Sequence, residues 1–285
     1  NQFISDINFP VVAANIDTSN DADLKDQTNL KPFVIFAFDG NNKTVVEDLN
    51  NLPQDKDLVA VFGLALDDMP NLAPNTGNVE FHDMVDSAQA TVDMFKSKGI
   101  NNIVALTHIG NAVDVDIASK VNGIDLIVGG HSHTLLGDFT NIGHDHNGTY
   151  AQMVQNPNGQ NQTCVVQAGQ YAQAIGQLAV SFDTNGDVTA CNGLNILLSN
   201  DEYYHSPTRE TESKFNSADT VKVVEFIDSE KNITITEEEA AMRGLIDSKY
   251  KPAVDQAYGS VIAQVADEIT HERRPGDRGT DKHGS

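Results

Sequence analysis

The chain has 285 residues, a length that fits one large domain or two small ones. Hydrophobic residues make up 39% and charged residues 21%, which supports a folded core and excludes a wholly disordered chain. Its 18 basic and 41 acidic residues give a net charge of −23, which excludes a basic surface that binds nucleic acid by neutralising phosphates.

Short apolar runs predict several strands in the first part of the chain. These runs are residues 9–16, 31–38, 44–46 and 58–64. The turn-forming cluster Asp39-Gly40-Asn41-Asn42 predicts that the second and third runs form a hairpin. No apolar run is long enough to cross a bilayer, so no transmembrane segment is expected.

A strand–helix–strand unit is predicted in the middle of the chain. The apolar spacing over residues 82–98 predicts a helix that stops at Gly99. A strand over 103–106, a short helix over 114–121 and a strand over 124–128 follow. Because a short helix joins the two strands, we expect them to be parallel neighbours.

The remainder of the chain is predicted to contain a loop, a second group of strands and a helix. Residues 135–163 are polar and loop-like, whereas 164–198 return to strand patterning. Thr236 and Glu239 match a capping box at the start of a long polar helix, which suits a linker between domains. A further strand is expected at 260–269.

Three histidines follow the two strands of the middle unit. His108 lies in the segment LTHIG, and His131 and His133 lie in the segment GGHSHT. Parallel strands bring their carboxyl ends to one edge of a sheet, where open α/β sheets bind ligands. Imidazole is a common ligand of divalent metal ions, so we expect a metal site here rather than three ordinary loop histidines.

Carboxylate ligands are not evident beside these histidines, although a two-metal phosphoesterase needs them. Asp39 is expected in a turn, and either Asp114 or Asp116 is expected to cap the short helix. A second His-x-His pair, His144 and His146, is interpreted as part of a solvated loop.

The two cysteines, Cys164 and Cys191, allow two interpretations. They are either buried free thiols or a disulfide across neighbouring strands at 163–168 and 188–191. We favour the disulfide, which indicates an oxidising compartment.

Several ordered segments resemble the bacterial 5'-nucleotidases, which belong to the calcineurin-like metallophosphoesterase superfamily. These segments are FPVVAANI (9–16), LTHIG (106–110), NGIDLIVGGHSHT (122–134) and VVQAGQYAQAIGQLAVSFD (165–183). The resemblance implies an α/β fold, a metallophosphoesterase-type β-sandwich flanked by helices, with two divalent ions (Zn, Mn, Co or Mg) and attack by a metal-bound hydroxide.

The resemblance also implies roles for single residues. His108 and His131 correspond to ligands of one ion, and His133 to a ligand of the other. Cys164 and Cys191 match a subgroup in which such cysteines are bridged.

Other motifs of that family are absent from the sequence. The D-x-H motif with which the family begins is not found ahead of FPVVAANI, and there is no G-N-H-E-F-D motif, so the catalytic His–Asp dyad is missing. We therefore expect an internal fragment, with 1–235 as a partial catalytic domain, 236–259 as a linker helix and 260–285 as the start of a C-terminal nucleotide-binding domain. Alone it should be largely inactive unless the missing segment or a complementing chain is supplied.

The predicted function is that of a periplasmic or secreted 5'-nucleotidase in the longer parent. Its substrate would be a nucleotide or nucleotide-sugar, with pyrophosphate bonds of UDP-sugars or NAD as a possible extension. Two alternatives stay open: a non-catalytic binding or surface protein on the same scaffold, and another metallophosphoesterase such as a cyclic-nucleotide phosphodiesterase or a sulfur-oxidation relative.

Overall fold

The computed structural model describes residues 2–73, 75–206 and 211–258. The chain divides into two compact units, Asn1–Ile235 and Thr236–Ser285, and each is described by itself. Within the described ranges, no helix has the length and apolar character that crossing a membrane requires.

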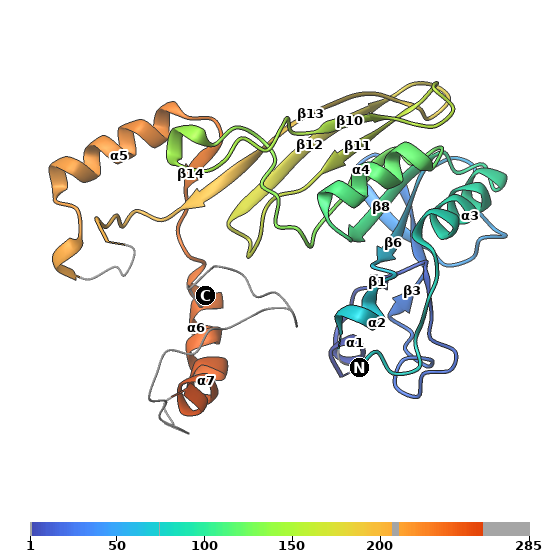
Figure 1. Cartoon of the computed structure of the whole chain (residues 1–285), viewed down its shortest axis with the longest axis horizontal. Coiled ribbons are helices and arrows are strands. Elements are labelled where there is room, and N and C mark those ends of the chain that lie inside the picture. Colours follow the sequence, from blue (N-terminus) through green and yellow to red (C-terminus); the bar gives the residue numbers. More distant parts are fainter. Residues whose placement is uncertain (1, 74, 207–210, 259–285) are drawn as a thin grey trace. The chain divides into compact units, whose positions relative to one another are not determined.

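A seven-stranded mixed sheet forms the centre of the first unit, in the order β10-β11-β9-β8-β6-β4-β5 (Figure 1). The inner strands β6, β8, β9 and β11 are parallel, whereas β4, β5 and β10 pair antiparallel with their neighbours. The expected hairpin and the expected parallel strand pair are both present. The strand bounds are β4 Phe33–Asp39, β5 Asn42–Val46, β6 Asp57–Ala65, β8 Asn102–His108, β9 Leu126–Val128, β10 Gln152–Gln155 and β11 Gln162–Val166.

Two helices contribute to the core beside this sheet. Helix α3 (Met84–Ser97) begins after Asp83, whose side chain accepts a hydrogen bond from the Asp86 backbone N–H at 2.8 Å. Helix α4 (Asn111–Lys120) begins after Gly110, not at Asp114 or Asp116. The expected carboxylate cap is therefore wrong, because the helix starts earlier and Asp114 is buried within its first turn.

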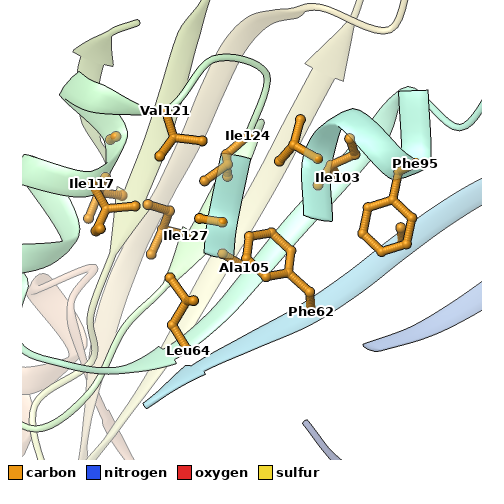
Figure 2. Packing of buried hydrophobic residues seen from close by; sticks show 14 of the residues in the cluster. Phe62, Leu64, Phe95, Ile103, Ala105, Ile117, Val121, Ile124 and Ile127 are labelled. Atoms are coloured by element: carbon orange, nitrogen blue, oxygen red, sulfur yellow. The ribbon is translucent and has the colours of Figure 1, made fainter. Parts of the chain in front are cut away.

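The core lies between these helices and the sheet, and Figure 2 shows its aliphatic and aromatic side chains. Phe95 of α3 is fully buried and packs edge-on against Phe33, with ring centroids 5.0 Å apart. Ile103 and Ala105 of β8 and Ile127 of β9 are also fully buried. This packing fixes the two parallel strands and hence the point at which each one ends.

A second sheet contains β12 (Ala174–Phe182), β13 (Val188–Ser199) and β14 (Ile233–Ile235). A disulfide joins Cys164 of β11 to Cys191 of β13, with the Cα atoms 6.4 Å apart. The two cysteines were expected on neighbouring strands. They lie instead on different sheets, because the long β12–β13 hairpin carries Cys191 onto β11.

The remaining elements of the first unit, apart from the 13-residue helix α5, are short. The expected strand at 9–16 is divided, because the buried Asn15 side chain bonds the backbone of Ala65 and His82 and interrupts the pairing. The elements are α1 Gln2–Asp6, β1 Val11–Val12, β2 Ile16–Asp17, β3 Leu30–Lys31, α2 Met69–Leu72, β7 Glu80–Phe81, η1 Thr140–Ile142, η2 Thr211–Ser213 and α5 Ser217–Ser229.

The described part of the second unit is helical. It contains α6 (Ala240–Leu245), the π-helical turn η3 (Ile246–Tyr250) and α7 (Lys251–Tyr258). Glu239 is itself the N-cap and accepts from the backbone N–H groups of Ala241 and Met242, so the expected capping box with Thr236 is wrong. The predicted strand at 260–269, like the domain expected at 260–285, lies outside the described residues.

Candidate metal centre

Two of the predicted histidines meet where β8 and β9 end. Leu106 of β8 pairs with Val128 of β9, so His108 and the turn that follows Val128 lie at the same edge of the sheet. The rings of His108 and His131 have centroids 5.2 Å apart at an interplanar angle of 76°. A Cβ atom at Gly130 would lie 2.9 Å from His108 Nδ1, so the absence of a side chain there leaves room for the imidazole.

Residues 129–134, here called the histidine turn, have a strained backbone. His131 has φ 76° and His133 has φ 56°, values in the left-handed region that residues other than glycine rarely adopt. The exposed Tyr171 lies next to the turn, with its ring centroid 6.0 Å from that of His133. Tyr171 and Ala172 are also left-handed, with φ 53° and 54°. Such strain concentrates at functional sites.

The histidine turn is connected to the start of helix α4 through Ser132. Its Oγ accepts a hydrogen bond from the Asn111 backbone N–H at 3.0 Å and lies 2.8 Å from Thr134 Oγ1. Gly110, with φ 99°, lets the chain turn into the helix at this point. The helix start is therefore held against the turn that carries the histidines.

A buried amide, that of Gln167, contacts the turn from the position directly after β11. Its Oε1 accepts from the Thr134 backbone N–H at 2.5 Å and from Ser132 Oγ at 3.0 Å, and its Nε2 donates to the Gly130 carbonyl at 3.0 Å. Sequence reasoning missed Gln167. The signal was a polar residue directly after the apolar strand at VVQAG.

Asp114 lies close to the other end of the same turn. Its Oδ1 accepts from Thr107 Oγ1 at 2.6 Å, whereas its buried Oδ2 has no hydrogen-bond partner among the described residues. Burial raises the pKa of this carboxyl to about 6, although the hydrogen bond from Thr107 opposes the shift. A side chain at Gly129 would collide with it.

The other aspartates considered above are placed by local structure. Asp39 ends β4 in the hairpin, as expected for a turn residue, and Asp116 pairs with Lys120 at 2.7 Å. In the second His-x-His pair, the exposed His146 has Nδ1 3.6 Å from Asp138 Oδ2.

One set of three metal-ligand side chains was not predicted. Among the described residues, Asp17, Glu80 and His82 alone have ligand atoms that all lie within 4.8 Å of one another. His108, His131 and His133 do not form such a set. Their donor chemistry nevertheless fits a borderline divalent ion, because two imidazoles lie close together at the ends of two parallel strands.

Comparison with known proteins identifies relatives along the whole chain. The trifunctional nucleotide phosphoesterase YfkN of Bacillus subtilis is 33% identical over 206 residues, 72% of this chain and 13% of that protein. The bovine 5'-nucleotidase is 32% identical over 198 residues, 68% of this chain and 31% of that protein. The NAD 5'-nucleotidase of Haemophilus influenzae is 25% identical over 295 residues, all of this chain and 45% of that protein.

The fold also matches a solved structure. The Haemophilus influenzae NAD nucleotidase superposes with a TM-score of 0.72 at 25% identity, over 90% of this chain and 42% of that one. No protein-family model matches the chain. The chain spans less than half the length of each of these relatives.

Proposed function

We propose that this chain, which is homologous to the 5'-nucleotidases along most of its length, provides the histidine part of a divalent-metal centre that hydrolyses nucleotide phosphate esters. The observation that carries the proposal is the close approach of the His108 and His131 rings at the carboxyl ends of two adjacent parallel strands. In this proposal His108 and His131 bind one ion and His133 binds a second.

A divalent ion would supply two things at this edge: polarisation of a phosphoryl oxygen, and hydroxide from water at neutral pH. The imidazole donors favour zinc or cobalt over magnesium, which prefers oxygen ligands. The bound cation would also offset the repulsion between an anionic nucleotide and a chain of charge −23. Carboxylate ligands and the residue that protonates the leaving group would come from elsewhere in the longer protein.

The substrate class follows from the names of the relatives. One is a nucleotide phosphoesterase, and another acts on NAD, which carries a pyrophosphate bond. We propose nucleoside monophosphates as substrates, with a nucleotide-sugar or dinucleotide pyrophosphate as an extension. The disulfide supports a periplasmic or secreted location.

Phosphate release from AMP, measured with zinc or manganese and then with a chelator, tests this proposal. His131→Ala should abolish metal-dependent release by the protein that contains this chain. His144→Ala is the matched control, because it removes an exposed histidine from the other His-x-His pair. Phosphate release that persists both in the chelator and in His131→Ala would overturn the proposal. Co²⁺ binding to the chain that is unchanged in both His131→Ala and His144→Ala would also overturn it.

A further inference from the structure

The histidine turn holds two non-glycine residues in the left-handed region within three positions, His131 and His133. A strained backbone of this kind persists only where surrounding contacts over-determine it. The turn is partly exposed to solvent, so burial of its own side chains does not supply those contacts. Hydrogen bonds must supply them, one of them within the turn, from the Ser132 N–H to the Gly130 carbonyl at 3.0 Å, and others from neighbouring elements.

Gln167 supplies them at alternate residues of the turn. Its amide bonds Gly130, Ser132 and Thr134 through three hydrogen bonds and uses both Oε1 and Nε2. The residues between them are His131 and His133. One buried side chain therefore fixes the positions on either side of each histidine.

Gln167 is itself fixed from two directions. Its side chain is buried, with 2% of the residue exposed, and it follows Val166, whose carbonyl accepts from the Gly129 backbone N–H at 2.9 Å. From the second sheet, Asn195 Nδ2 donates to the Gln167 carbonyl at 2.9 Å. The amide thus has little freedom to move with the turn.

We infer that Gln167 is a positioning residue that holds the His-x-His turn in a geometry ready to bind metal before the ion arrives. The inference rests on the proposed function. It assigns Gln167 no contact with substrate or metal. Its effect reaches the ion only through the backbone that carries His131 and His133.

The experiment compares Gln167→Met, which keeps the length of the side chain and removes all three hydrogen bonds, with Gln89→Met. Gln89 is the matched control, because its amide also bonds a turn, at Asn122, but at the opposite end of β9. The probe is Co²⁺ alone, titrated by its visible absorption. Hydrogen exchange of the peptide covering 129–134 reports on the turn without metal.

Gln167→Met should weaken Co²⁺ binding roughly 10- to 100-fold, the range for loss of a residue that orients metal ligands. It should also accelerate exchange at Thr134, whereas Gln89→Met should change neither. Gln167→Glu keeps the two acceptor contacts and should recover part of both losses, and it replaces Gln167→Met if that variant unfolds. Co²⁺ binding within about twofold of the unmodified chain in folded Gln167→Met, or in Gln167→Glu where that variant replaces it, would overturn the inference.

The two proposals fail in different ways. If the unmodified chain binds Co²⁺ no better than His131→Ala does, the proposed metal centre is wrong. Exchange at Thr134 still reports whether Gln167 holds the turn. If binding depends on His131 but exchange at Thr134 is unchanged in Gln167→Met, only the inference about Gln167 is wrong.

Discussion

Reduction of the Cys164–Cys191 disulfide should destabilise the first unit of the chain. The bond links β11 of the seven-stranded sheet to β13 of the three-stranded sheet and closes a loop of 27 residues. Constraining such a loop in the unfolded chain removes about 12 cal/mol/K of entropy, or about 3.5 kcal/mol at 25 °C. For a unit of this size, each kcal/mol corresponds to roughly 2–4 °C in melting temperature.

When a reductant is added, the melting temperature measured by circular dichroism should fall by roughly 7–14 °C. The double variant Cys164→Ala/Cys191→Ala is the control and should melt near the reduced chain, with or without reductant. Its Cys164→Ala change also removes a buried side chain, so its melt should lie slightly below that of the reduced chain. A shift of less than 2 °C on reduction would refute the loop-closure reasoning.

Three further changes test the core, a buried carboxyl and the candidate metal centre. Phe95→Ala should lower the free energy of unfolding by about 3–5 kcal/mol, because its ring is fully buried against Phe33. A decrease below 1 kcal/mol, measured by urea unfolding, would contradict this. Burial raises the pKa of Asp125 to about 7, so its contribution to stability is complete below pH 3.8 and is lost as the pH rises through 7. Asp125→Asn should therefore raise the free energy of unfolding by up to about 4 kcal/mol over the unmodified chain at pH 8 and leave it unchanged at pH 3, and equal effects at both pH values would exclude the shift. Gly130→Ala should weaken Co²⁺ binding without changing the melting temperature, because the added Cβ would lie 2.9 Å from His108 Nδ1. Unaltered Co²⁺ binding would show that the His108 ring is not a ligand.

The sequence predicted the parts of the fold that depend on local pattern. The helix at 82–98 was expected from apolar spacing and is observed as Met84–Ser97, because the same spacing buries Val92 and Phe95. The parallel pairing of β8 and β9 followed from the short helix between them. The meeting of His108 and His131 then required only that both strands end at one edge.

Contacts between residues far apart in the chain could not be predicted in the same way. The strand that carries Cys191 was expected beside the strand that carries Cys164, whereas it belongs to the second sheet, because strand patterning does not say which of two sheets a hairpin joins. Either Asp114 or Asp116 was expected to cap the short helix, since a polar residue near a helix start usually does so. The burial of Asp114 depends on the approach of β9, which brings Gly129 against it.

The hydrogen bonds of Gln167 to the histidine turn show why three histidines in a sequence do not by themselves define a metal site. The sequence places His131 and His133 two residues apart, but in an extended segment alternate side chains share one face only while the backbone stays regular. Here both residues are left-handed, so their directions are set by whatever holds the turn. That group, the amide of Gln167, directly follows β11, more than thirty residues further along the chain, and bonds the turn at 130, 132 and 134. The geometry of the histidines is therefore a property of the sheet as a whole, and a peptide with the sequence GGHSHT alone should lack it.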